Sequence, residues 1–330
     1  MSESSAFVIP AEWAPQSRIW TAWPSHPELW PGTLLQEARS EIAAMVRIIA
    51  GQTPFHVLAF GEEAVQSAAA ALGDVATIVP ARFGDVWLRD TGPIFTGTGG
   101  CLRFASNGWG GKYIYEFDDE VGDTIAGLAT APISRFPFVL EGGALEHNGK
   151  GALLTTRQCL LNPNRNGWDE TTATVRLQQA FNATAVYWLD DGVLYDHTDG
   201  HVDNLARFVG ENTVVCQRAF GEDDPNAQLH EKTASDLQAL GLDVVQIPSP
   251  GLVKDEEGSV MPASHMNFII SNGAVIVPVY GTASAEQAVA ELAELFPGRQ
   301  VVGVKANALL TGGGSFHCIT QQEPVVGEHS

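Results

Sequence analysis

The chain has few cysteines, and their spacing does not suit crosslinking or zinc binding. Cys101, Cys159, Cys216 and Cys318 lie far apart, and no C-x-x-C pair occurs. Structural zinc sites that use cysteine take closely spaced pairs of ligands, so the spacing argues against such a site. A chain of 330 residues with isolated thiols is typical of a reducing compartment. We therefore expect free thiols and a cytoplasmic protein.

Positive charge and long apolar runs are also scarce. The sequence holds 18 Lys and Arg against 39 Asp and Glu, a formal net charge of −21. Nucleic acids and anionic membranes bind clustered Lys and Arg, so the composition argues against both as partners. The acidity suits a small cationic substrate, but it serves solubility equally well. No apolar run approaches the ~20 residues that a membrane-spanning helix needs, and the first residues do not resemble a signal peptide.

Hydrophobic residues make up 45% of the chain, which is ordinary for a folded protein with a large core. No linker-like segment interrupts the sequence, so a single domain over residues 1–330 is expected. The segment from 11 to 31 is rich in tryptophan and proline and is interpreted as an extended arm with a strand at 18–22. Exposed tryptophans on this arm would offer an interface, so a homo-oligomer is one possibility.

A pattern of polar residue, short apolar strand, turn and returning strand occurs several times, with a helical stretch and a lone strand between copies. The residues that introduce the strands are Asp90, Glu141, His201, Asn267 and Cys318, at intervals of 51 to 66 residues. With the N-terminal strand and helix, the chain holds about five such units. Repeats of this length are typical of radial arrays, which close their sheet edges around a central channel. Coincidence in a generic α/β chain is the alternative. In a ring, the introducing residues would converge on the axis.

Cys318 follows three consecutive glycines, Gly312-Gly313-Gly314, and precedes the β-branched pair Ile319-Thr320. Consecutive glycines cost backbone entropy and supply no side chain, so they indicate a tight turn or a close approach to a ligand. A glycine loop feeding a short strand is therefore predicted, with the cysteine between them. The thiol is either a nucleophile or a buried structural cysteine.

His201 and Asp203 lie two residues apart, so on a strand both side chains would face the same side. Histidine and aspartate could bind a metal, but such a site would need further ligands, and Cys318 would be unusual beside Asp90 and Glu141. We predict no metal and no other cofactor.

Alternatively, His201 could act as the proton-transfer partner of a Cys318 nucleophile. Carboxylates around this pair would repel the oxyanion that a protease must stabilise. They suit a guanidinium, which is planar, permanently charged and offers paired N–H donors to carboxylates. Asp90 and Asp203 would then hold the nitrogens and place the central carbon against the sulfur.

Five segments closely resemble the agmatine deiminases, which belong with the bacterial peptidylarginine-deiminase-like proteins in the guanidino-group-modifying (pentein) superfamily. The resemblance covers about residues 10–324, and several long motifs in order are more specific than one short pattern. The segments are Trp87–Pro93, Glu141–Gly143, Leu161–Asn166, Thr198–Val209 and Gly312–Gln322.

This resemblance implies a five-bladed α/β propeller and a metal-free mechanism with a covalent thiouronium intermediate. It makes Cys318 the nucleophile and His201 the acid and base, with Glu141 supporting His201. Asp90 and Asp203 would bind the guanidinium. Agmatine would give N-carbamoylputrescine and ammonia.

Trp87 either flanks the substrate or is a packing residue. The sequence departs from the family's pattern at Asn307-Ala308, at Ser315-Phe316 and in the segment 189–197. These departures leave the tail beyond the guanidinium open. A deiminase of another guanidine such as peptidyl-arginine, or a non-catalytic polyamine or guanidine binder, are the alternatives.

Overall fold

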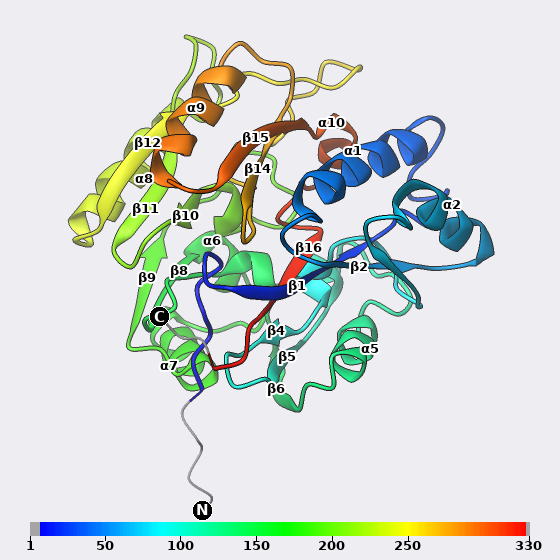
Figure 1. The fold of residues 1–330 in the computed structure, drawn as a ribbon. Coiled ribbons are helices and arrows are strands. Elements are labelled where there is room, and N and C mark those ends of the chain that lie inside the picture. The colour runs from blue at the N-terminus through cyan, green and yellow to red at the C-terminus, as the bar shows by residue number, and fades with distance from the viewer. Residues whose placement is uncertain (1–6, 328–330) are drawn as a thin grey trace, which may run out of the picture.

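Five small sheets surround a common centre, and helices lie on the outside of the ring (Figure 1). The structure is a computed structural model that describes residues 7–327. Four sheets have three strands and one has four. Each three-stranded sheet is an antiparallel pair extended by one parallel strand, and the four-stranded sheet is extended by two. This arrangement confirms the five-bladed α/β propeller.

The strands follow the chain blade by blade. The first blade is the four-stranded one and has the order β16-β1-β2-β3. The three-stranded blades are β4-β5-β6, β7-β8-β9, β10-β11-β12 and β13-β14-β15. The strands are β1 (Gln16–Ala22), β2 (Phe55–Ala59), β3 (Thr77–Pro80), β4 (Ile94–Phe95), β5 (Cys101–Ala105), β6 (Ile133–Val139), β7 (Glu146–His147), β8 (Ala152–Thr156), β9 (Ala185–Leu189), β10 (Ala206–Phe208), β11 (Thr213–Arg218), β12 (Asp243–Pro248), β13 (Ile269–Ile270), β14 (Ala274–Val279), β15 (Gln300–Lys305) and β16 (Thr320–Pro324).

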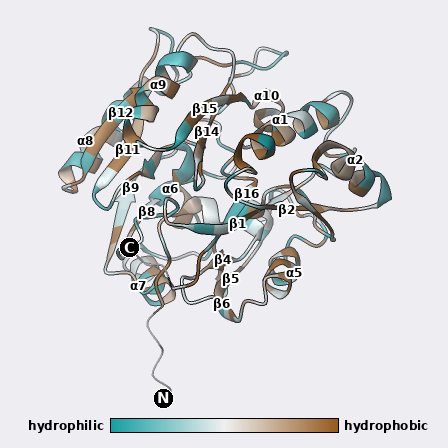
Figure 2. Cartoon of the chain, in the orientation of Figure 1, coloured by the Kyte–Doolittle hydropathy of each residue, from teal (hydrophilic) through white to brown (hydrophobic). Residues whose placement is uncertain are grey.

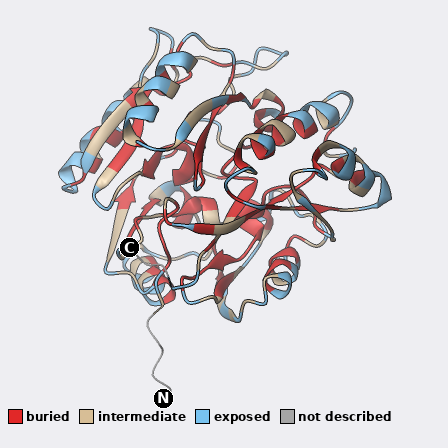
Figure 3. Ribbon diagram, viewed as in Figure 1, coloured by how far each residue is buried: buried red, intermediate tan, exposed pale blue. Residues whose placement is uncertain are grey.

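Helices connect the parallel strands within each blade and cover the outer faces of the sheets (Figure 1). Their outward sides are exposed, whereas the strands near the centre are buried (Figure 3), and the helices carry both apolar and polar surfaces (Figure 2). The helices are α1 (Leu34–Ile49), α2 (Glu62–Leu72), α3 (Leu88–Thr91), α4 (Gly108–Gly111), α5 (Val121–Leu128), α6 (Arg157–Leu160), α7 (Glu170–Phe181), α8 (Ala227–Ala239), α9 (Ala285–Leu295) and α10 (Asn307–Gly312), with 3₁₀ turns η1 (Gly142–Ala144) and η2 (Val202–Asn204).

The two ends of the chain close the ring. Strand β16 pairs antiparallel with β1, with Thr320 opposite Thr21 and Gln321 opposite Trp20. Strand β1 in turn pairs in parallel with β2. Strands β1 and β16 therefore share one blade, and this blade needs both to be complete.

Several expectations for local structure were wrong. The tryptophan-rich arm is not an exposed surface, because Trp20, Trp23 and Trp30 are at most 1% exposed and pack in the largest hydrophobic cluster. This removes the basis for an interface there. Helix α5 was not anticipated, because two glycines within eight residues weaken its helical signal.

The glycine run and the His201 segment also differ from expectation. Gly312 is the last residue of helix α10 and Gly313 caps it in a left-handed conformation at φ 115°, so the run terminates a helix. His201 is not on a strand: it precedes the 3₁₀ turn η2, which holds Asp203.

Candidate active site

Cys318 lies between helix α10 and strand β16, so the short strand after it was predicted correctly. The thiol is 4% exposed. Gly314 makes room for it: a Cβ on this residue would lie 2.7 Å from the Trp87 ring and 3.2 Å from Sγ of Cys318. Position 314 therefore requires glycine, because a side chain would not fit between the Trp87 ring and the sulfur.

Asn267 holds both the backbone and the side chain of the cysteine. Its Nδ2 donates to Sγ of Cys318 at 3.1 Å, and its Oδ1 accepts from the backbone N–H groups of His317 at 3.0 Å and Cys318 at 3.2 Å. Asn267 is fully buried and comes just before β13. Asn267, which introduces the fourth hairpin, thus positions Cys318, the last of the introducing residues.

Asp203 is the carboxylate nearest the sulfur. Sγ of Cys318 lies 3.6 Å from Oδ2 of Asp203, and Nδ1 of His317 lies 2.8 Å from the same oxygen. The other oxygen, Oδ1, is buried and has no hydrogen-bond partner among residues 7–327. Burial raises the pKa of Asp203 well above its usual value, and the neighbouring Asp90 raises it further. A cationic ligand would supply the missing partner.

Asp90, in helix α3, is oriented by two donors from different parts of the chain. The backbone N–H of Gly143 donates to Oδ1 at 2.8 Å, and Nε1 of Trp109 donates to Oδ2 at 2.8 Å. Nδ1 of His201 lies 3.8 Å from Oδ2. Burial raises the pKa of Asp90 to about 7, and the charge of Glu141 adds to this rise.

Gly143 lies where these groups meet. A Cβ on it would be 2.7 Å from Nδ1 of His201, 2.9 Å from Oδ1 of Asp90 and 3.0 Å from Oδ2 of Asp203. Three side chains that are far apart in sequence therefore converge around one Cα atom. Any side chain at this position would displace them, which explains why the Glu-Gly-Gly segment needs its second glycine.

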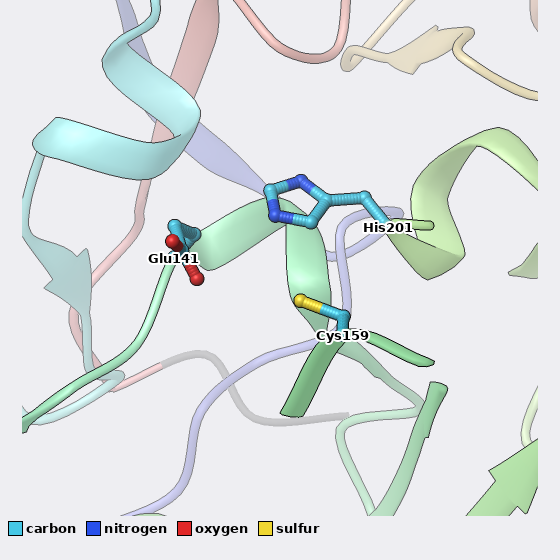
Figure 4. Close-up of side chains that lie close together, drawn as sticks. All are labelled: Glu141, Cys159 and His201. Carbon is cyan, nitrogen blue, oxygen red and sulfur yellow. The ribbon is translucent and has the colours of Figure 1, made fainter. Parts of the chain in front are cut away.

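His201 is completely buried, with Glu141 and the Cys159 thiol beside its ring (Figure 4). Neither ring nitrogen has a hydrogen-bond partner in the part of the chain that the structure describes, and Oε2 of Glu141 is equally unpartnered. Oε1 of Glu141 accepts from Nε of Arg165 at 2.8 Å. Burial lowers the pKa of His201 well below its usual value, and the charge of Arg165 lowers it further.

Glu141, Cys159 and His201 offer an oxygen, a sulfur and a nitrogen within 4.8 Å of one another, a set that could be considered for a metal. The buried Arg165 guanidinium, however, already pairs with Glu141 and with Asp199. Its positive charge would repel a divalent ion at this place. The electrostatics therefore favour a hydrogen-bonded proton-transfer group over a metal centre.

A cleft that is open to solvent at its mouth leads to the sulfur. Asp90, Trp87 and Cys318 line it, whereas Asp203, His201 and Glu141 lie behind this first layer. Nε1 of Trp87 donates to Oδ2 of Asp85 at 2.9 Å, which fixes the indole beside Gly314. The remaining lining residues are Trp109, Tyr113, Tyr115, His197, Thr198, Gly312 and Gly313.

Burial disfavours the charged forms of the groups around the sulfur. Burial raises the pKa of the Cys318 thiol well above its usual value, and the charges of Asp203 and Asp90 raise it further. The same carboxylates would stabilise a cation in the cleft, and a bound cation would in turn favour the thiolate. The positive charge that favours the Cys318 thiolate therefore has to be supplied by the ligand.

Sequence reasoning missed several residues of this region. Trp109 orients Asp90, Tyr113 and His197 form a wall of the cleft, and His317 joins Asp203 to Glu12 through Nε2 at 3.1 Å. Glycines on either side of Trp109 were a usable signal, because this residue has a left-handed φ of 51°. No pattern of neighbouring residues pointed to Glu12, because its partners Arg207 and His317 lie 195 and 305 residues away along the chain.

Such a ring of five strand–hairpin–helix units, with hairpin residues converging on a buried cysteine, defines a protein of the pentein class. The family model for Porphyromonas-type peptidyl-arginine deiminase matches residues 8–324. The chain belongs to this family.

Named relatives cover nearly the whole chain. An agmatine deiminase from Stutzerimonas stutzeri is 34% identical over 96% of this chain and 95% of its own length. The structure of Enterococcus faecalis agmatine deiminase superposes with a TM-score of 0.89 at 30% identity, covering 96% of each chain. A substrate-bound cysteine-to-serine variant of C. jejuni agmatine deiminase gives 0.89 at 27% identity, with 96% coverage of both chains.

Proposed function

We propose that this protein hydrolyses the guanidinium group of agmatine to N-carbamoylputrescine and ammonia. The observation that carries the proposal is the placement of a thiol 3.6 Å from the carboxylate of Asp203, in a cleft that Asp90 also lines. Full-length relatives named agmatine deiminase support the choice of substrate.

The two aspartates act as a guanidinium clamp. Oδ1 of Asp203 is unpartnered among the described residues and can accept one N–H, while Asp90 is held rigidly by Trp109 and Gly143. Carboxylates on two sides of a planar cation fix its orientation and bring its central carbon to the sulfur. The Trp87 indole, lining the same cleft, packs against the flat cation.

The reaction begins when the bound cation favours ionisation of Cys318. The thiol proton passes to His201, and the thiolate forms a C–S bond to the guanidinium carbon. His201 lies next to Asp90, so it protonates the nitrogen that Asp90 holds. The C–N bond breaks, ammonia leaves, and the substrate remains on the sulfur as a thiouronium.

Water completes the turnover. His201 takes a proton from water as its oxygen forms a bond to the thiouronium carbon. The C–S bond then breaks, the electron pair returns to the sulfur, and the ureido product leaves. His201 returns its proton to the sulfur, which regenerates the thiol, and the second proton of the water passes to the released ammonia, which leaves as ammonium. Glu141, with a free oxygen beside His201, stabilises the imidazolium that forms in each half-reaction.

The free cysteines and the net charge of the chain are consistent with the proposed function. All four cysteines are free, which supports a cytoplasmic location. The net charge of −21 favours a small cationic partner over nucleic acid or anionic membrane surfaces. Among the described residues, no helix has the length and apolar character needed to cross a membrane.

The decisive experiment measures ammonia and the ureido product after incubation with agmatine, with arginine and an arginine-containing peptide as parallel substrates. Agmatine should give both products in equal amounts, and chelators should leave the rate unchanged. Tight binding of agmatine without product over hours would instead show a non-catalytic binder. Faster turnover of the peptide would move the assignment to peptidyl-arginine.

A further inference from the structure

The outer part of the cleft is aromatic and lacks a free carboxylate. Among the described residues that line it, Asp90 is the only acidic one, and Asp90 belongs to the guanidinium end. The lining residues Tyr113, Tyr115 and His197 are less buried than Asp90 and form the wall of the outer part. A second cation at the far end of a substrate would therefore face rings and hydroxyl groups.

His197 and Tyr113 form one continuous wall. Their rings stack with centroids 6.0 Å apart and an interplanar angle of 22°, and Oη of Tyr113 lies 3.4 Å from Nδ1 of His197. Tyr113 in turn meets Trp109 edge to face at 6.4 Å. Gly313 fixes the other side, because a Cβ there would lie 3.2 Å from Nδ1 of His197. These contacts make a flat surface that suits methylene groups.

The two acidic residues that flank His197 most closely in its own segment, Asp196 and Asp199, are already engaged. Asp199 pairs with Nζ of Lys112 at 2.8 Å and with Nη1 of Arg165 at 2.7 Å. Asp196 accepts from the backbone N–H and the hydroxyl of Thr198 at 2.9 and 2.7 Å. Both carboxylates are therefore saturated by partners of their own chain and do not line the cleft.

We propose that the Tyr113–His197 wall makes this enzyme a deiminase of monosubstituted alkylguanidines, in which the tail is selected by apolar contact and not by a second positive charge. The proposal rests on the function proposed above. It assigns His197 as a specificity-determining residue. Agmatine is then one substrate among alkylguanidines, because its terminal amine finds no ion-pairing partner at the wall.

The test compares kcat/KM for agmatine, n-butylguanidine and the shorter ethyl and propyl homologues in the native chain. Agmatine and n-butylguanidine should agree within about fivefold, since an exposed ion pair contributes at most about that factor. Each added methylene should raise kcat/KM about two- to fourfold, as expected for partial burial against the aromatic wall. An advantage of agmatine above fivefold, or rates independent of tail length, would overturn the proposal.

Two variants distinguish the effect of the wall on substrate preference from the effect of the protein's overall charge. His197→Glu places a carboxylate at the wall and should shift the ratio of agmatine to n-butylguanidine about two- to fivefold toward agmatine, as expected for one partly exposed ion pair. Leu194→Glu adds the same charge in the same segment at a residue that is 46% exposed and does not line the cleft, and it should leave the ratio unchanged. Equal shifts in both variants would show a long-range field and refute the role of His197. If no guanidine releases ammonia, the proposed function itself is wrong.

Discussion

The side-chain amide of Asn267 donates a hydrogen bond to the sulfur of Cys318 across 3.1 Å, while its carbonyl oxygen holds the backbone of the same residue. A hydrogen bond to sulfur stabilises the thiolate more than the thiol, and this donor opposes the rise of the Cys318 pKa caused by burial and by Asp203. One residue thus couples the position of the nucleophile to its ionisation.

Replacing Asn267 should therefore raise the pKa of Cys318 and slow its alkylation. We expect Asn267→Asp to lower kcat/KM by roughly tenfold to a hundredfold, the range for a hydrogen bond to a charged group. This variant keeps the oxygen that accepts from the backbone of His317 and Cys318 but removes the donor. The check is the pH profile of inactivation by iodoacetamide, which should shift upward; an unchanged profile would contradict the argument.

Cys318→Ser should abolish turnover and leave the melting temperature within a few degrees of the native value. A hydroxyl is a poor nucleophile in this site, and the thiol-to-hydroxyl change is small in volume. Cys159→Ala is the matched control: Cys159 is fully buried beside His201, and burial raises its pKa well above normal. Mass spectrometry of protein stopped during turnover should find a substrate adduct in the peptide that contains Cys318. An adduct elsewhere would refute the assignment of the nucleophile.

Asp90 should make substrate binding depend on pH around neutrality. Burial raises the pKa of its carboxyl to about 7 in the empty site, so it is mostly protonated below that pH. A guanidinium needs the ionised form, so binding should release a proton below pH 7 and affinity should increase as the pH rises toward 7. Calorimetry of Cys318→Ser with agmatine in buffers of different ionisation enthalpy measures this release. Proton uptake would contradict the prediction.

The same carboxyl should reduce stability as the pH rises. Its pKa in the folded protein lies above the ordinary value of 3.8, so the unfolded state binds fewer protons between about pH 4 and pH 7, and ionisation of Asp90 destabilises the fold over that window. Asp90→Asn should therefore be more stable than the native chain at pH 8, by on the order of 1–4 kcal/mol, and inactive. At pH 4 the difference should largely vanish. Denaturant unfolding at the two pH values tests both statements.

Gly143→Ala should remove activity through a single methyl group. Its Cβ would lie 2.7 Å from the His201 ring and 2.9 Å from Asp90, so the catalytic groups must separate. We expect a loss of at least about a hundredfold in kcat/KM, as for a misplacement of reacting groups by about 1 Å, and a destabilisation of about 1–3 kcal/mol. Gly127→Ala in helix α5 is the control, since nothing lies within 4 Å of its Cβ, and it should stabilise the fold by about 0.5–1 kcal/mol. Near-native activity of Gly143→Ala would refute the convergence of the three side chains.

The repeat, the ring and the positions of Asp90 and Asp203 could be predicted because each depends on a pattern of neighbouring residues in the sequence. A polar residue before a short apolar strand is visible at Asp90 and His201 without any knowledge of contacts. The wall of the cleft could not be predicted in this way. Trp109 reaches Asp90 from a separate turn, and His197 meets Tyr113 across 84 residues, so only the closed ring brings these pairs together.

The strand at 18–22 was predicted correctly, but the interpretation of the tryptophan-rich arm as an exposed surface was wrong for a related reason. Trp20 lies on β1, between β2 and β16, and its burial depends on a strand at the other end of the chain. A pattern of tryptophans and prolines does not indicate which distant segment will cover them. The departures at Asn307-Ala308 lie at the start of α10, where Glu41 of α1 accepts hydrogen bonds from the backbone N–H groups of Ala308 and Leu309.

Because β16 completes the blade that β1 begins, the protein cannot assemble its reactive centre during synthesis on the ribosome. The segment with Cys318 follows the other strands of the ring along the chain, so it leaves the exit tunnel after them and must then find the first strand of the fold. A translation product that stops before Cys318 has neither the sulfur nor the strand that pairs with β1.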